Sequence, residues 1–423
     1  MGTILFLNSQ TLATPFTISS LQNVVIRPYV YVASTADYLF QGTSANSIDN
    51  SGEIIGNIWL GNNDSSWANS IYNRQGASIS GYVILKGDGN SIINKGSIIQ
   101  ASALYATVYI SAVNASSSIT NASGAEISGA NVAIIRGASN DTAAVKLTNY
   151  GTIMGGNLAY DGKYCVASDI IYNAGVMQGD VNLGSGDDRY DGRRGTIDGT
   201  VFGGDGVDIF LPGAGAEAFD GGAGSDRVDF SSAAGAVQVY LDGSGLNAGL
   251  AAGDVYTAVE TFVGTALADI LVGDVGANYF VGGGGADTLD GRAGSDALTG
   301  GFGADALTGG AGSDSFVYNS AAEGAATEII SDLTNRTGEN DMIRVSASGF
   351  GGGLTAGLYL TAAQFVAYSG AFTDTANLRF YFDTSTNLLS YDADGSGAEY
   401  ARTPIAKVFG TGGFTNADIF VMG

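Results

Sequence analysis

The feature that most constrains this fold is a nine-residue period that runs without insertion from Gly264 to Val317. The units read GTALADILV, GDVGANYFV, GGGGADTLD, GRAGSDALT, GGFGADALT and GGAGSDSFV. The same register appears upstream in GGDGVDIFL, PGAGAEAFD and GGAGSDRVD over residues 203–229, and in a lone LGSGDDRYD over residues 183–191. Glycine tolerates positive φ, so the first six residues of a unit can form a sharp turn. The last three form a short strand whose middle, apolar side chain points inward.

Two units make one coil, so residues 18 apart stack on the same edge of a parallel solenoid. Asp269, Asp287 and Asp305 then form one column, and Asp296 and Asp314 belong to the opposite one. Carboxylates stacked about 4.8 Å apart repel by ~1 kcal/mol per pair in water, and by more where they are partly buried. The columns are therefore unfavourable unless a cation lies between successive turns. Carboxylate and carbonyl oxygens are hard ligands that suit Ca²⁺.

The repeat resembles the GGxGxDxUx nonapeptide of RTX proteins, which form a calcium-binding β-roll. The resemblance implies a roll over residues 183–317 that folds only where calcium is plentiful, outside the cell, with residues 230–263 as a spacer. It implies metal ligands at the turns, namely Asp188, Asp208, Glu217, Asp226, Asp269, Asp287, Asp296, Asp305 and Asp314 together with Gly203, Gly221, Gly282, Gly284, Gly291, Gly300 and Gly309. The pattern is broken at Thr265, Ala266, Leu267, Asn278 and Glu217, which weakens the expectation of calcium at those turns.

A second, looser repeat runs through residues 46–182, as in SIDNSGEIIG and KLTNYGTIMG. Its asparagines are Asn50, Asn73, Asn94, Asn121, Asn149 and Asn173, spaced 23, 21, 27, 28 and 24 residues. Spacings in the twenties with short alternating strands predict the coils of a parallel β-helix, similar to bacterial surface β-helix repeats. The stacked asparagines either hydrogen-bond along the solenoid as a ladder or serve only as turn formers that tolerate left-handed backbone.

The two ends of the chain differ from the repeats. Residues 1–45 are apolar and β-branched, and we expect them to cap the first edge of the solenoid or to pair with a neighbouring molecule. Residues 318–423 resemble the C-terminal region of RTX proteins that leave by type I secretion, and the segment ADIFV at 417–421 resembles the uncleaved signal. The segment DADGSG that begins at Asp392 is either a hairpin turn or an EF-hand-like loop, with Thr403 where a bidentate Glu is required.

Composition excludes several functional classes. The formal charge of −24 argues against a nucleic-acid partner and favours cations as ligands. Without histidine the chain can form no His-based zinc site, Ser-His-Asp triad or HExxH metalloprotease motif. Cys165, the single cysteine, lies in an apolar stretch and is predicted to be a buried, inert thiol. No run of ~18 apolar residues indicates a membrane-spanning helix, and the N-terminus lacks a basic n-region, so any export signal is expected elsewhere.

The predicted fold class is all-β: a parallel β-solenoid in which an N-terminal β-helix continues into a calcium β-roll, followed by a C-terminal β-rich secretion-signal region. Nearly the whole chain is thereby accounted for, so we expect a secreted, non-enzymatic structural protein that self-assembles into a surface layer, filament or matrix, as RTX-bearing surface-layer proteins do. The expected partners are Ca²⁺, further copies of the chain and the type I secretion machinery, with cell-surface polysaccharide as a further candidate. The alternatives are an adhesin that binds glycans around Trp59, Trp67 and Tyr82, and a polysaccharide lyase or epimerase, for which the missing histidines leave few bases.

Overall fold

The computed structural model describes residues 2–423 except 20, 44, 63–66, 113, 138–140, 327, 337–338, 371–376, 396–401 and 412. The described residues form β-strands joined by turns, and their one α-helix is the single turn α1 (Ala347–Phe350). The long parallel sheets confirm the predicted all-β solenoid. The chain divides into two compact units: unit 1 contains residues 1–227 and 254–259, and unit 2 contains residues 228–253 and 260–423.

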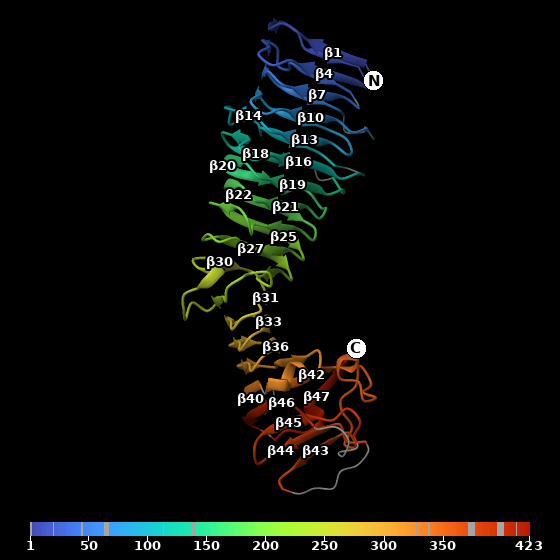
Figure 1. The fold of residues 1–423 in the computed structure, drawn as a ribbon, viewed down its shortest axis with the longest axis vertical. Coiled ribbons are helices and arrows are strands. Elements are labelled where there is room, and N and C mark those ends of the chain that lie inside the picture. The colour runs from blue at the N-terminus through green and yellow to red at the C-terminus, as the bar shows by residue number, and fades with distance from the viewer. Residues whose placement is uncertain are drawn as a thin grey trace. The chain divides into compact units, whose positions relative to one another are not determined.

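Unit 1 is a parallel β-helix with three strands in each of its early coils (Figure 1). The first sheet stacks β1 (Gly2–Phe6), β4 (Gln22–Ile26), β7 (Ser47–Asn50), β10 (Ser70–Asn73), β13 (Ser91–Asn94), β16 (Ser117–Asn121), β19 (Val145–Asn149), β21 (Ile170–Asn173), β23 (Arg189–Asp191) and β26 (Ile209–Leu211). The second strand of each coil is β2 (Gln10–Leu12), β5 (Tyr31–Ser34), β8 (Glu53–Ile55), β11 (Ser78–Ser80), β14 (Ser97–Gln100) or β17 (Glu126–Gly129). The third strand is β3 (Phe16–Ile18), β6 (Phe40–Gly42), β9 (Ile58–Leu60), β12 (Val83–Leu85), β15 (Val108–Ile110) or β18 (Val132–Arg136). These two runs merge in β20 (Thr152–Asp161) and β22 (Val176–Ser185), and continue in β24 (Thr196–Ile197), β25 (Thr200–Gly206), β27 (Ala218–Gly224) and β30 (Val255–Thr257).

Strict side-chain alternation decides what fills the interior of this β-helix. One inward position of the first sheet is aliphatic in successive coils and at most 1% exposed: Ile48, Ile71, Ile92, Ile119, Leu147 and Ile171. These residues are direct partners in the strand register, so they stack into one apolar row. Each buried side chain contributes about 1.5–3 kcal/mol. A slip of one residue would turn the whole row toward water, which fixes the register.

The solenoid begins before residue 46, the boundary predicted for the β-helix. Strand β1 pairs in parallel with β4, and β4 pairs with β7. Val24 lies opposite Ile48 in the apolar row, and Ile26 takes the place of the ladder asparagine Asn50. Residues 2–42 therefore form coils of the solenoid itself. The asparagine motif could not reveal them because these coils lack the asparagine.

The ladder hypothesis for the asparagine repeat is confirmed, and none of these asparagines takes the left-handed backbone of the alternative. The Asn50 Nδ2 group donates to Asn73 Oδ1 at 2.9 Å, and the chain of bonds continues through Asn94, Asn121 and Asn149 to Asn173 at 2.8–2.9 Å. The Oδ1 atom of Asn50 also accepts the N–H of Gly52 at 3.1 Å, which closes the turn after the strand. The side-chain amides are completely buried, so without the ladder they would be donors and acceptors buried with no hydrogen-bond partner, which destabilises a fold.

Unit 2 begins with a roll of two strands per coil (Figure 1). One sheet contains β31 (Thr261–Val263), β33 (Tyr279–Gly284), β36 (Ala297–Phe302), β39 (Ser315–Tyr318), β42 (Met342–Ser346) and β47 (Ile419–Met422). The other contains β29 (Gln238–Tyr240), β32 (Ile270–Val272), β34 (Thr288–Asp290), β37 (Ala306–Thr308), β40 (Glu328–Arg336) and β46 (Thr403–Thr411), followed by β45 (Leu388–Tyr391), β44 (Phe380–Asp383) and β43 (Phe365–Tyr368). Leu271, Leu289 and Leu307 are register partners 18 residues apart, as the period predicts. The spacer 230–263 supplies β29 and β31 to unit 2 and β30 to unit 1.

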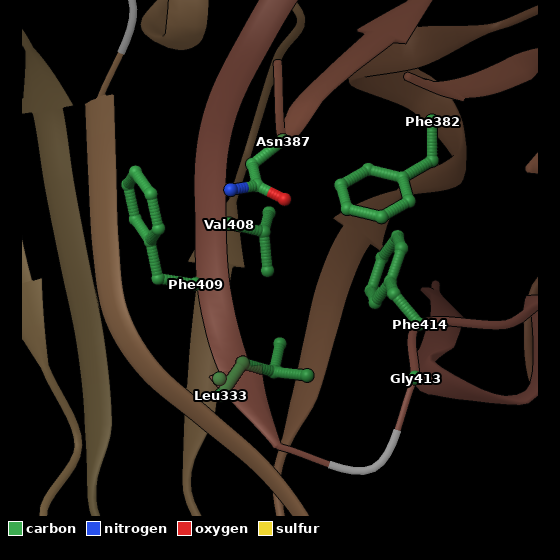
Figure 2. Close-up of a pocket in the computed structure, with 8 residues that line it drawn as sticks. Leu333, Phe382, Asn387, Val408, Phe409, Gly413 and Phe414 are labelled. Carbon is green, nitrogen blue, oxygen red and sulfur yellow. The ribbon is translucent and has the colours of Figure 1, made fainter. Parts of the chain in front are cut away.

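The C-terminal part of unit 2 has an apolar core of its own. Leu333, Phe382, Val408 and Phe414 line a small cavity, where the rings of Phe382 and Phe414 lie 4.9 Å apart (Figure 2). In the segment ADIFV, Ala417 and Asp418 lie in a 3₁₀ helix (Asn416–Asp418), and the following apolar residues lie in strand β47, which pairs in parallel with β42. Asp392 Oδ1 accepts the N–H groups of Asp394 at 3.2 Å and of Gly395 at 3.0 Å, so residues 392–395 form a turn after β45, which runs antiparallel to β46. Residues 396–401, which would complete an EF-hand-like loop, lie outside the described residues.

Candidate calcium site

Two residues with left-handed backbone (positive φ) shape each regular turn of the roll. In the nonapeptide that begins at Gly282, the second and fourth residues, Gly283 and Gly285, have φ values of 104° and 110°. The same two positions have positive φ in the nonapeptides that begin at residues 183, 203, 221, 291, 300 and 309. Glycine is needed at the fourth position, because a Cβ on Gly303 would clash with the carbonyl oxygen of Gly285 in the preceding coil. At the second position, Arg292 shows that a side chain is tolerated at a φ of 70°.

One oxygen of the position-6 aspartates links neighbouring coils. In unit 2 the Asp287 N–H donates to Asp305 Oδ1 at 2.7 Å, and in the opposite column the Asp296 N–H donates to Asp314 Oδ1 at 2.8 Å. In unit 1 the Asp188 N–H donates to Asp208 Oδ1 at 2.7 Å. The Asp208 N–H donates in turn to Asp226 Oδ1 at 2.8 Å. This bond orients the carboxylate and leaves its second oxygen facing the turn.

That second oxygen is buried and accepts no hydrogen bond from the described residues in Asp188, Asp208, Asp287, Asp296, Asp305 and Asp314. These aspartates are at most 1% exposed. A Cβ on Gly282 would meet both Asp287 Oδ2 and the carbonyl oxygen of Gly300, which lies in the next coil. Oxygens from two coils therefore surround a small space over the glycine, here called the cradle. None of the described residues places a side-chain donor against the Oδ2 atom in it. Buried oxygens in this arrangement are costly unless a cation joins them.

The donor set fits Ca²⁺ only if the backbone takes part. Among the described residues no three acidic or cysteine side chains gather closely enough to hold a metal by themselves. Carboxylate and carbonyl oxygens from adjacent coils are the hard, flexible ligands that calcium accepts in large numbers. The position-6 carboxylate and the glycine carbonyl of the next coil would hold calcium there, and the ion would supply the positive charge that these oxygens lack.

The electrostatics of the turns favour a cation as well. Burial raises the pKa of Asp287 and Asp296 to about 7 and the pKa of Asp188 to about 8, since a buried carboxylate loses its hydration. The nearby carboxylate of Asp305 adds to the increase at Asp287. A divalent cation in the cradle reverses this effect, because it favours the ionised carboxylate.

Comparison with protein families points to the same turns, apart from the one that contains Asp188. The family model of the RTX calcium-binding nonapeptide repeat, which spans four copies, matches residues 198–228, 263–298 and 293–320. The chain carries RTX calcium-binding nonapeptide repeats in these segments. RTX repeats bind Ca²⁺, which is therefore its cofactor, and RTX proteins are typically secreted. No curated protein matches the chain significantly. Within the described residues no helix has the length and apolar character needed to cross a membrane.

Asp269 is the predicted ligand whose surroundings differ most from those of the other RTX turns. Its Oδ2 atom accepts the N–H of Thr265, and its Oδ1 atom accepts the Thr265 hydroxyl at 3.1 Å and the N–H of Val237 at 2.7 Å. Both oxygens are thus satisfied by the protein, and the geometry gives no support for Asp269 as a ligand. Thr265, at the second position of the unit, supplies the donors that the glycine turns lack. In the next unit Asn278 Oδ1 likewise accepts the N–H of Asp274 at 3.0 Å.

Glu217 keeps one oxygen for a cation. Its Oε2 atom accepts the N–H of Gly213 at 2.7 Å, whereas Oε1 is buried and accepts no hydrogen bond from the described residues. Burial raises the pKa of this carboxyl to about 7. The longer side chain therefore accepts a hydrogen bond from its own turn. Like the aspartates, it leaves one buried carboxylate oxygen that a cation could bind.

The predicted glycine ligands fall into two groups. The carbonyl oxygens of Gly221, Gly282, Gly291, Gly300 and Gly309 each lie beside the position-6 side chain of the preceding coil. Gly203 instead forms the floor of the Asp208 cradle, and Gly284 donates its N–H to the Thr265 carbonyl at 3.1 Å. The first group faces the cradles with an oxygen, and the second shapes the turns.

Two acidic residues beyond the nonapeptides continue the columns of unit 2 and were missed by the sequence analysis. The Asp314 N–H donates to Asp341 Oδ1 at 2.9 Å. Glu328 is the first residue of β40, and its neighbour Ile329 is the register partner of Ala306, so Glu328 lies level with Asp305; it is 1% exposed. Burial raises the pKa of Glu328 to about 9. The available signal was an acidic residue before an apolar strand, which is too common to single out either residue.

Proposed function

We propose that this RTX-repeat protein is an extracellular structural protein that self-assembles into a layer, filament or matrix once calcium has folded its roll. The observation that carries the proposal is the pair of carboxylate columns with buried, unpaired Oδ2 atoms, as at Asp287 and Asp296. Such turns favour the folded state only where calcium is abundant, because metal binding is coupled to folding. The chain would cross the type I machinery unfolded and fold outside. RTX repeats are typically structural, and we propose no enzymatic activity.

Outward-facing rows on the β-helix offer surfaces for self-association. In one row, every second coil presents an apolar side chain: Ile55, Ile99 and Met154 are 41%, 40% and 37% exposed. Ser80 and Ser128 lie between them in the strand register. A regular, rigid ridge of this kind can interdigitate with the same ridge on a second copy, as the cores of subunit interfaces do.

The test is a calcium titration of the full chain from chelator to ~10 mM, the upper range for extracellular calcium modules, followed by light scattering and negative-stain microscopy. Ordered sheets or fibres that appear with calcium and dissolve with chelator support the proposal. Folded but monodisperse monomers in calcium contradict it. In the variant Ile55→Lys/Ile99→Lys we expect the roll to fold and assembly to fail. The control Thr120→Lys/Thr148→Lys adds the same charge to outward positions of the first sheet and should still assemble.

A glycan-binding adhesin remains the second candidate, favoured by an aromatic cluster on the β-helix. The rings of Trp59 and Tyr82 lie 5.2 and 6.0 Å from that of Tyr38, and Lys86 Nζ lies 4.9 Å from the Trp59 ring. Gln41, Thr43 and Asn62 line the pocket beside Trp59. Aromatic faces flanked by amides and hydroxyls suit sugar rings. Trp67, the third predicted residue, is also exposed. Binding on a glycan array that Trp59→Ala abolishes would establish this function, and unchanged binding would exclude this surface.

A further inference from the structure

A second polar column runs through unit 1 and joins the β-helix to its RTX turns. It lies four residues before the ladder asparagines and comprises Asn46, Asn69, Asn90 and Ser117, then Asp169, Asp188, Asp208 and Asp226. The Asn69 N–H donates to Asn90 Oδ1 at 2.9 Å, just as the Asp188 N–H donates to Asp208 Oδ1 at 2.7 Å. The coils with asparagine and the coils with aspartate therefore share one construction.

The two kinds of coil differ in the second atom of the side chain. In the coils of Asn69 and Asn90 this atom donates a hydrogen bond: Asn69 Nδ2 donates to the Lys86 carbonyl at 3.2 Å, and Asn90 Nδ2 donates to the Gly87 carbonyl at 2.8 Å. A Cβ on Gly61 would meet the Lys86 carbonyl oxygen and Asn69 Nδ2. At the equivalent place in the RTX coils, a Cβ on Gly203 would meet the Gly221 carbonyl oxygen and Asp208 Oδ2. The amide thus donates where the aspartate coil needs a cation.

Arg136 lies where the column changes from asparagine to aspartate. Its guanidinium donates from Nη1 to Asp169 Oδ1 at 2.6 Å and from Nη2 to the carbonyl of Ala143, and both charged side chains are completely buried. Tyr160 donates its hydroxyl to Asp169 Oδ2 at 2.6 Å. Val145 interrupts the polar column at this coil, and its N–H donates to Asp169 Oδ1 at 2.9 Å. Both oxygens of Asp169 are therefore satisfied, and the guanidinium joins a turn carbonyl to a carboxylate of the next coil, as calcium would.

We propose that Arg136 is a built-in cation that replaces calcium at the first carboxylate of the column. The β-helix through about Asn173 then folds without calcium, and the coils from Asp188 onward require the metal. The folded β-helix serves as a template to which each RTX coil of unit 1 adds when calcium arrives, because a solenoid coil is stabilised by its nearest neighbour. This inference concerns folding and does not depend on self-assembly.

Hydrogen–deuterium exchange of the full chain, in chelator and in calcium, tests where the calcium requirement begins. We expect the amides of strands between residues 46 and 173 to be protected in both conditions, and the amides of residues 188–211 to be protected only in calcium. Chelator that exposes both segments alike would overturn the proposal. So would chelator that exposes neither.

Two variants test the role of Arg136 itself. Arg136→Met keeps the apolar stem and removes the cation, so in chelator the strands that contain Val145 and follow Asp169 should lose their protection. Arg136→Met/Asp169→Asn should restore it, because the new amide supplies the donor that Asn69 supplies in its own coil. A role of Arg136 in packing alone would not be rescued by this second change. Full protection in Arg136→Met, or no recovery in the double variant, would refute the assignment.

Discussion

The substitution Asp287→Asn should convert one RTX turn of unit 2 from a calcium-dependent to a calcium-independent state. Its Oδ1 atom would still accept the Asp269 N–H, now 2.8 Å away, while a new Nδ2 group would face the Gly300 carbonyl. Burial raises the pKa of Asp287 from 3.8 to about 7 in the calcium-free fold. That difference corresponds to roughly 4 kcal/mol against the ionised form. The stability that protonated Asp287 gives is present below pH ~4 and is lost as pH rises through about 7. At pH ~8 the amide should therefore stabilise the calcium-free roll by up to about 4 kcal/mol.

The assay is thermal unfolding followed by far-UV circular dichroism at pH ~8, in chelator and in calcium. In chelator, where the wild-type roll is unfolded, the variant should retain more β-structure on heating than the wild type, and it should gain less from calcium because it has lost a charged ligand. The control Asp290→Asn removes the same charge from a partly exposed position, where Asp290 pairs with Arg292 at 3.2 Å, and should change chelator stability little. Equal effects of the two substitutions, or a less stable Asp287→Asn in chelator, would refute the reasoning.

Three further predictions follow from other contacts. Gly206→Ala should lower the free energy of unfolding by about 2 kcal/mol or more and weaken calcium-induced folding. The reason is that Gly206 has a φ of 144° and abuts the Gly186 carbonyl. The control Gly215→Ala lies at the same position of the next nonapeptide with open space around it, and it should be near neutral in the same calcium titration. Asn121→Ala should lower the free energy of unfolding in urea by about 2–4 kcal/mol, because it breaks the buried ladder. The control Asn157→Ala removes only an exposed hydrogen bond. An equal loss of stability in the two variants would contradict the role of the ladder. The calcium concentration at half-folding should rise as pH falls from ~8 to ~6, because protons compete for carboxylates such as Asp296, whose pKa is about 7; a pH-independent midpoint would argue against these ligands.

The repeats predicted much of the fold because their information is local. A nine-residue period with glycine, aspartate and an apolar residue at set positions allows essentially one arrangement, and the partners 18 residues apart, such as Leu289 and Leu307, follow from counting. The family comparison confirms the RTX repeats, and the hydrogen bonds confirm the asparagine ladder. Cys165 is buried as predicted, with burial raising the pKa of its thiol to about 12.

By itself the sequence determined the class of fold, the metal and the columns, since each depends on residues at a constant spacing. Only the tertiary structure decided which carboxylates are left in need of a cation. Asp269 is satisfied by Thr265 of its own nonapeptide and Asp169 by Arg136, 33 residues earlier, whereas Asp188 keeps an unpaired oxygen. Coils of 21 to 28 residues bring together groups whose separation along the chain varies. The partner that neutralises Asp169 is therefore set by the stacking of coils, and a motif of fixed length cannot contain it.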